Sequence, residues 1–168
     1  MMLLVLVGPP GSGKTSVGLV LADRLAAMFR DTDDDVEVAS GRSVSDIFVE
    51  SGETTFRALE KVAVAKALAE HDGVLALGGG AVLDAATRQL LSGHRVVHLD
   101  VGLAEAMRRL EMNRSRPLLL GNVRTQWQAL ADARRPFYEE VADQVIATDA
   151  LTPDQIAQQI ADYWQERP

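Results

Sequence analysis

Residues 8–15 of the chain read GPPGSGKT and fit the phosphate-binding pattern G-x-x-x-x-G-K-[ST] at every fixed position. An apolar run at residues 3–7 precedes this segment, and Val17, Val20 and Leu21 recur behind it at helical spacing. The order of strand, glycine-rich turn and helix brings backbone N–H groups and the positive end of the helix to one point. The segment therefore predicts a phosphate-binding loop at the end of a buried strand.

The residue types in this loop suit phosphate chemistry. Gly11 and Gly13 allow backbone angles and a close approach that a Cβ would block. Lys14 supplies a mobile positive charge for the outer phosphates, and the hydroxyl of Thr15 is placed to ligate Mg²⁺. The loop alone leaves open whether the phosphoryl group passes to water, to another protein or to a small acceptor.

Short apolar runs alternate with longer amphipathic segments along the rest of the chain. We expect strands at residues 3–7, 29–31, 74–77, 94–100 and 145–147. We expect helices behind the glycine-rich loop, at residues 54–70, 103–110 and 127–141 (bent or broken at Pro136), and after Pro153. This alternation predicts an α/β fold with a central parallel sheet of about five strands flanked by helices. Without repeats or linkers, a single domain over residues 1–168 is expected.

Composition narrows the class of protein. The net charge of −7 argues against a surface built to grip nucleic acid or an anionic membrane. The absence of cysteine excludes disulfides and thiolate metal sites. The sequence offers neither the roughly 20 apolar residues of a membrane span nor the charged start of a signal peptide. We therefore expect a soluble cytoplasmic protein that binds neither nucleic acid nor membrane.

Acidic residues follow the second expected strand. If residues 31–33 are extended, Asp31 and Asp33 point to the same side, where Mg²⁺ and a hydroxylated substrate would explain two neighbouring carboxylates. In the alternative, these aspartates decorate a solvated loop or cap the next helix. Residue types alone do not choose between the two.

Arginines and glycines supply candidates for the rest of a substrate site. Arg57, Arg116 and Arg134 together suit a cationic pocket for carboxylates or phosphates, although each alone suits an exposed surface, and Arg57 an exposed salt bridge. Residues 78–80 are three consecutive glycines, which suit either a turn or a close approach of backbone to a ligand. The histidines lack ligand spacing, so we expect satisfied structural residues at His71, His94 and His98.

The chain resembles the shikimate kinase family along its whole length. The matching segments are GPPGSGKT at 8–15, DTD at 31–33, GRSVSDIF at 41–48, GETTFRALE at 52–60, LALGGGAV at 75–82, RPLL at 116–119 and RRPFY at 134–138. The resemblance implies a three-layer P-loop NTPase fold with a substrate-binding segment at about 32–61 and a mobile lid at about 112–123. It also implies a monomer that uses Mg²⁺ and transfers the γ-phosphoryl group of ATP to the 3-hydroxyl of shikimate, in aromatic amino acid biosynthesis.

The resemblance implies an ATP site made of the loop and two arginines, namely Gly11, Ser12, Gly13, Lys14, Thr15, Ser16, Arg109 and Arg116. In the family pattern Lys14 holds the β- and γ-phosphates, while Thr15 and Asp31 hold Mg²⁺. Arg116 closes from the lid over the transferring phosphoryl group, and Arg109 lies against the adenine ring. The family often has a further basic residue near adenine, which residues 147–154 lack.

The implied shikimate site consists of Asp33, Arg57, Gly78, Gly79, Gly80 and Arg134. Asp33 accepts a hydrogen bond from the attacking hydroxyl as base or orienter, so that Asp33, Lys14 and Arg116 form the catalytic set. Arg57 and Arg134 clamp the carboxylate, with the glycines against the ring. The extra arginines Arg114 and Arg135 leave open which arginine acts.

Two other functions stay open on the sequence. One is another small-metabolite kinase of the same architecture, such as a gluconate kinase or a nucleoside monophosphate kinase. The glycine triplet and Arg57 favour a cyclic carboxylate over a nucleotide as the acceptor. The other is a nucleotide-dependent switch. A guanine switch would carry an N-K-x-D motif, and neither Lys61 nor Lys66 stands in one.

Overall fold

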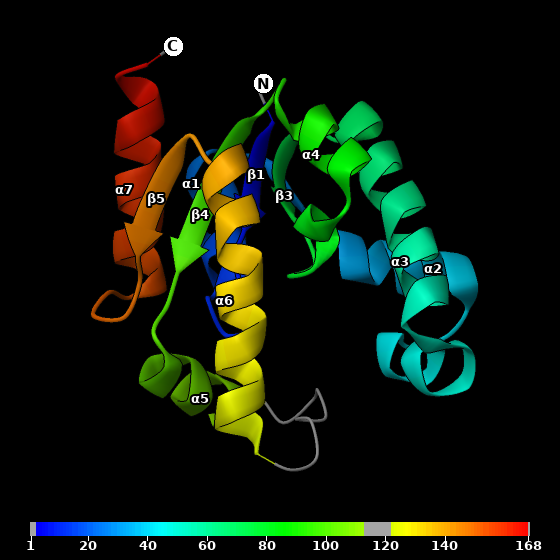
Figure 1. Cartoon of the computed structure of the whole chain (residues 1–168). Helices are drawn as coiled ribbons and strands as arrows, with labels where there is room; N and C mark the ends of the chain where they lie inside the picture. The colour runs from blue at the N-terminus through cyan, green and yellow to red at the C-terminus, as the bar shows by residue number, and fades with distance from the viewer. Residues whose placement is uncertain (1–2, 113–121, 168) are drawn as a thin grey trace.

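The computed structural model of the chain describes residues 3–112 and 122–167. Within these residues a five-stranded sheet has the order β2-β3-β1-β4-β5, and every pair is parallel. Its strands are β1 (Leu4–Val7), β2 (Met28–Asp31), β3 (Gly73–Ala76), β4 (Arg95–Asp100) and β5 (Gln144–Ala147). Helices cover both faces of this sheet (Figure 1). The expected three-layer α/β fold is confirmed.

The helices are α1 (Lys14–Arg24), α2 (Thr32–Ser40), α3 (Val44–Glu70), α4 (Ala85–Leu91), α5 (Leu103–Met112), α6 (Val123–Val141) and α7 (Pro153–Gln165), with a 3-10 turn η1 (Ala81–Leu83). On β1, Val5 and Val7 face a core shared with α3, α4 and α6, while Leu4 and Leu6 face α1 and α7. This burial on both faces explains why the first strand is apolar at every position. None of the helices in the described residues is long and apolar enough to span a membrane.

Helix α3 begins ten residues before the expected start at residue 54. Ser43 caps its first turn, because the Ser43 hydroxyl accepts the N–H of Asp46 at 3.1 Å. Gly52 then leaves the helical region at φ 85° and ψ 173°, which places a kink inside the helix. The first half of α3 was not predicted, because Gly52 separates it from the regular helical pattern that follows.

The structure also decides two points that the sequence left open. Helix α6 is not interrupted at Pro136 and runs as one helix from Val123 to Val141. Buried residues on both sides of the proline, Trp127 and Tyr138 among them, anchor the helix along one face. The extended conformation stops at Asp31, which ends β2 and caps α2, so Asp33 lies in the first helical turn.

The sheet places two loops side by side. Strand β1 lies between β3 and β4, and all these strands are parallel. The Leu77 N–H donates to the Leu6 carbonyl at 3.1 Å, so the pairing continues to the carboxyl ends of the two strands. The phosphate-binding loop after β1 and the glycines after β3 therefore open onto the same edge of the sheet.

Candidate active site

The predicted phosphate-binding loop joins β1 to α1. Gly11 (φ 83°) and Gly13 (φ 94°) adopt left-handed conformations that favour glycine. The Lys14 ammonium donates to the Gly8 carbonyl at 2.7 Å and to the Pro9 carbonyl at 3.1 Å, so it lies over the loop. The arrangement suits a cradle of N–H groups at a helix N-terminus with one cation beside it.

Two side chains support the loop from outside. The indole N–H of Trp127 donates to the Pro10 carbonyl at 2.9 Å. The Arg109 guanidinium donates to the Gly11 carbonyl at 3.1 Å and to the Thr148 carbonyl at 2.9 Å. Arg109 thus connects the loop to the segment after β5, on the side where the family pattern puts adenine. This contact of Trp127 was not predicted, because its spacing is that of an ordinary apolar residue of a helix.

The aspartates after β2 reach different parts of the site. The Thr15 hydroxyl lies 3.5 Å from Oδ2 of Asp31, whose Oδ1 accepts the N–H of Asp33 at 2.9 Å. The Thr32 hydroxyl accepts the N–H of Gly78 at 3.2 Å, which ties this segment to the glycines. Asp31 therefore faces the phosphate loop and also caps α2.

Glycine at position 78 makes room for two carboxylates. A Cβ added there would lie 2.6 Å from Oδ1 of Asp33 and 2.7 Å from Oε2 of Glu60. Both side chains are almost fully buried. The backbone at Gly78 therefore approaches two protein carboxylates closely, and a side chain there would displace them; the close approach to a ligand stays a prediction.

The other two glycines contact the arginines. A Cβ at Gly79 would lie 3.2 Å from a terminal nitrogen of Arg134, and a Cβ at Gly80 would overlap the Arg57 guanidinium. The structure therefore brings together Asp33, Arg57, Arg134 and the glycine triplet, the residues for which the resemblance implies a shikimate site.

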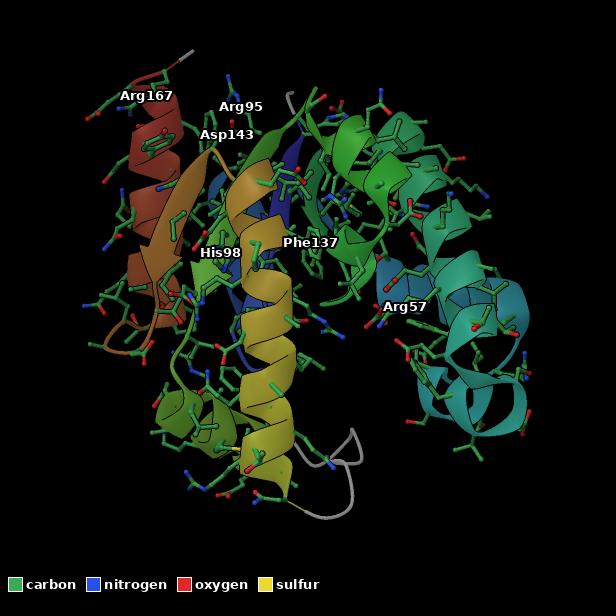
Figure 2. All side chains as sticks on the ribbon, viewed as in Figure 1. Arg57, Arg95, His98, Phe137, Asp143 and Arg167 are labelled. Atoms are coloured by element: carbon green, nitrogen blue, oxygen red, sulfur yellow. The ribbon has the colours of Figure 1, made fainter. Side chains whose placement is uncertain are left out.

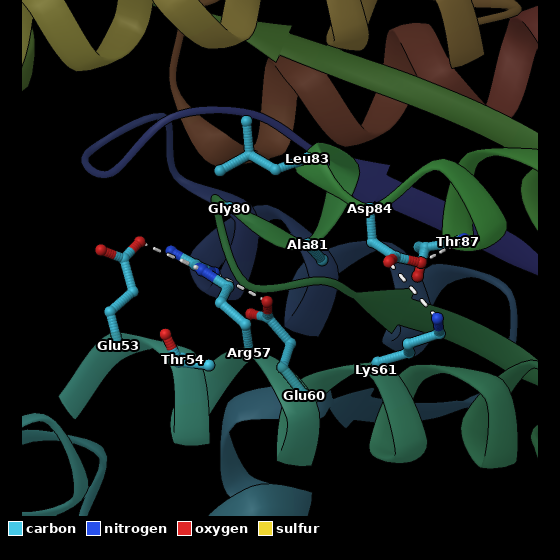
Figure 3. Close-up of a pocket in the computed structure, with 10 residues that line it drawn as sticks. All are labelled: Glu53, Thr54, Arg57, Glu60, Lys61, Gly80, Ala81, Leu83, Asp84 and Thr87. Atoms are coloured by element: carbon cyan, nitrogen blue, oxygen red, sulfur yellow. Dashed lines mark hydrogen bonds and ion pairs between the residues drawn. The ribbon is translucent and has the colours of Figure 1, made fainter. Parts of the chain in front are cut away.

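Arg57 belongs to a partly buried ion pair. Its NH1 donates to Oε1 of Glu60 at 2.7 Å, and its Nε donates to Glu53 at 3.4 Å (Figure 3). Glu60 is only 3% exposed, so the alternative of an exposed salt bridge is wrong for this pair. Burial raises the pKa of the Glu60 carboxyl, and the Arg57 cation opposes that rise.

Arg134 is a buried cation, 9% exposed. Burial lowers the pKa of its guanidinium, and the neighbouring Arg57 cation lowers it further. No carboxylate in residues 3–112 or 122–167 lies within ion-pair distance of it. Arg135 instead points to Asp100, with its NH1 3.3 Å from Oδ1, so Arg134 is the arginine at the glycines. Two neighbouring cations with one of them buried suit an anionic ligand.

A pocket of about 380 Å³ opens beside these groups. It lies between α3 and the segment from Gly80 to α4, as Figure 3 shows. The residues that line it are Glu53, Thr54, Arg57, Glu60, Lys61, Gly80, Ala81, Leu83, Asp84 and Thr87.

The predicted lid cannot be compared with the structure, because Arg114, Arg116 and most of residues 112–123 lie outside the described residues.

Two of the histidines differ in their surroundings. His71 is a satisfied structural residue, since its Nε2 lies 3.2 Å from the Met28 carbonyl and 3.0 Å from the Val74 carbonyl. His98 is not, because neither ring nitrogen has a hydrogen-bond partner in the described part of the chain. It lies on β4 behind α6 (Figure 2), and burial lowers its pKa.

Comparison with known proteins agrees with this geometry. A sequence model of the family described as "Shikimate kinase" matches residues 10–165. The curated shikimate kinase of Streptomyces avermitilis is 57% identical over 95% of this chain and 93% of its own length. That of Thermobifida fusca is 52% identical over 95% and 92%.

Solved structures give the same result. The shikimate kinase of Acinetobacter baumannii, solved in complex with shikimate, superposes with a TM-score of 0.93 at 34% identity, over 99% of this chain and 94% of its own. The enzyme of Aquifex aeolicus gives a TM-score of 0.83 at 26% identity, over 98% and 96%. The loop, the carboxylates and the arginines therefore stand in a known fold, and the chain belongs to the shikimate kinase family.

Proposed function

We propose that the chain transfers the γ-phosphoryl group of ATP to the 3-hydroxyl of shikimate. The observation that carries this proposal is the placement of Arg57 and Arg134 against the glycine triplet, with Asp33 beside them, in a chain of net charge −7. A cyclic acid bearing hydroxyls would present its carboxylate to the arginines and a hydroxyl to Asp33. The relative from Acinetobacter baumannii, solved with shikimate bound, supports this choice of acceptor.

Each residue has a distinct part in the proposed reaction. Asp33 accepts a hydrogen bond from the attacking hydroxyl and directs its oxygen at the phosphorus. Lys14 neutralises charge on the outer phosphates, and Arg116 is proposed to do so from the lid. Arg57 and Arg134 hold the acceptor so that its hydroxyl is in line with the leaving group.

The nucleotide would lie along the loop after β1. Backbone N–H groups of Gly11, Ser12 and Gly13 would hold its phosphates, together with the first turn of α1 at Thr15 and Ser16. Arg109 is half-buried beside this loop, where one face of its guanidinium would contact adenine.

Thr15 and Asp31 fit a magnesium site. Their side-chain oxygens lie 3.5 Å apart at the edge of the phosphate loop, and Mg²⁺ prefers oxygen ligands from one or two side chains together with phosphates. No group of three His, Cys, Asp or Glu suited to a metal occurs in the described residues, so the phosphates would have to complete the set. Bound there, Mg²⁺ would neutralise charge on the β- and γ-phosphates.

The test is ADP release with ATP, Mg²⁺ and shikimate, compared with the same mixture lacking shikimate. Gluconate and nucleoside monophosphates serve as competing acceptors, and Lys14→Met as the inactive control. We expect that, among these acceptors, only shikimate stimulates ADP release. Faster release with another acceptor would favour a different metabolite kinase, and nucleotide binding without any acceptor-dependent release would favour a switch. The expected monomer and cytoplasmic location stay predictions, the first testable by sedimentation.

A further inference from the structure

We infer that the hydroxyl of Tyr138 is a positioning group for the acceptor site, because it holds the Gly79 carbonyl beside the Arg134 guanidinium. This inference rests on the proposed function, since it concerns how the carboxylate of shikimate is held. Tyr138 itself has no place in the chemistry and acts through the peptide that it holds.

A hydrogen bond of Tyr138 connects two elements of the site. Its hydroxyl donates to the Gly79 carbonyl at 2.5 Å, from α6 to the loop after β3. Arg134 lies one helical turn before Tyr138 on the same face of α6, and one of its terminal nitrogens would lie 3.2 Å from a Cβ at Gly79. The hydroxyl therefore holds the peptide that the Arg134 guanidinium approaches.

The tyrosine ring is held in place by its surroundings. Tyr138 is 2% exposed, and its ring stacks on that of His98 with centroids 5.0 Å apart and planes 30° apart. Because the ring has only two side-chain torsions, this stacking fixes the position of the oxygen. Burial raises the pKa of Tyr138 to about 12, which keeps the hydroxyl protonated at neutral pH.

The glycines next to this hydroxyl contact both arginines of the acceptor site. Fixing the Gly79 carbonyl fixes the planar peptide unit that leads to Gly80, and the Arg57 guanidinium packs on Gly80. Gly79 itself lies against Arg134, a buried cation whose neighbour is a second cation. Without the hydroxyl, the apolar packing of the ring would persist, while the peptide that contacts both arginines would no longer be held in place. Tyr138→Phe therefore separates packing from positioning.

Tyr163→Phe is the matched control. The Tyr163 hydroxyl also donates to a backbone carbonyl, that of Asp143 at 3.1 Å, and lies on α7 away from the glycine triplet. Both variants and the unsubstituted chain are assayed for kcat, for KM of shikimate and ATP, and for shikimate affinity by calorimetry. Their Tm values are compared as well. The assays are repeated with the methyl ester of shikimate, which lacks the negative charge.

We expect Tyr138→Phe to raise KM and Kd for shikimate about tenfold, the effect of one lost hydrogen bond that holds the site in its binding geometry. KM for ATP and kcat should stay within about twofold, and Tyr163→Phe should match the unsubstituted chain. With the methyl ester, the ratio between Tyr138→Phe and the unsubstituted chain should fall towards one.

Several results would overturn the inference alone. They are a KM for shikimate within twofold in Tyr138→Phe, an equal rise in KM for ATP, the same penalty with the ester, or a Tyr138→Phe chain that is unfolded at the assay temperature. If the unsubstituted chain does not phosphorylate shikimate, the proposed function fails and the inference fails with it.

Discussion

Gly80→Ala is expected to weaken shikimate binding while leaving the fold intact. Gly80 has φ −99° and ψ 2°, a conformation that alanine adopts without backbone strain. The new Cβ would overlap the guanidinium of Arg57. That guanidinium is the far end of a flexible side chain, so Arg57 would move and the peptide would stay.

The structure sets the size of the effect. A displaced guanidinium loses its hydrogen bonds to the substrate carboxylate, and a bond between charged groups contributes about 1.5–3 kcal/mol. At 1.4 kcal/mol for each factor of ten, KM for shikimate should rise about 10- to 100-fold. Displacing Arg57 also weakens its ion pair with the buried Glu60, and the alanine offsets part of that loss because it restricts the unfolded chain, so the Tm should fall by less than about 10 °C.

The assay compares Gly80→Ala with Gly93→Ala. A Cβ at Gly93 would find its nearest neighbour, the Leu90 carbonyl, at 4.0 Å, so this control adds a methyl group without displacing a side chain. KM for ATP should be unchanged in both. The reasoning is refuted if a folded Gly80→Ala chain binds shikimate as tightly as the control, since Arg57 would then not be the group that holds the substrate.

Three more predictions follow from the site. Asp33→Asn should bind ATP normally but lower kcat by about 10²-fold or more, and near-normal turnover would remove Asp33 from the reaction. Burial, opposed by Arg57, raises the pKa of Glu60 in the folded chain. The protonated carboxyl therefore adds to the free energy of unfolding below pH 4.5, and this contribution is lost as the pH rises through the folded pKa. The stability advantage of the unsubstituted chain over Glu60→Gln, read from denaturant midpoints, should therefore shrink above pH 4.5, and an advantage that grows would contradict burial as the cause. EDTA should abolish turnover but leave the Tm of the nucleotide-free chain unchanged, because no cluster of metal-binding side chains occurs in residues 3–112 or 122–167; turnover that survives EDTA would speak against a metal at Thr15 and Asp31.

Local patterns predicted the parts of the molecule that local backbone geometry determines. The loop at 8–15 requires glycines and a lysine at fixed spacing, and the strand at 4–7 is apolar at every position because both of its faces are buried. Of the two interpretations of residues 31–33, helix capping is confirmed, because the carboxylate of Asp31 accepts the N–H of Asp33 and starts a helix there.

Long-range contacts escaped prediction for a physical reason. The hydroxyl of Tyr138 meets a carbonyl 59 positions away, and the indole of Trp127 meets one 117 positions away. Neither residue differs in type or spacing from an ordinary core residue of an amphipathic helix. The burial of Glu60 likewise depends on Gly78, because a side chain there would occupy the space of the Glu60 carboxylate, and the two residues meet only in the folded chain.

The pairing of β1 with β3 has a consequence for how core substitutions should affect activity. The loops that would carry donor and acceptor leave strands bonded to each other through their peptides, about 4.8 Å apart. The hydrogen bonds between the two strands then set the distance between the phosphate loop and the acceptor loop, and a substitution in the core does not change that spacing. Damage to the interior should therefore reduce how many molecules are intact, while each intact molecule keeps its full catalytic rate.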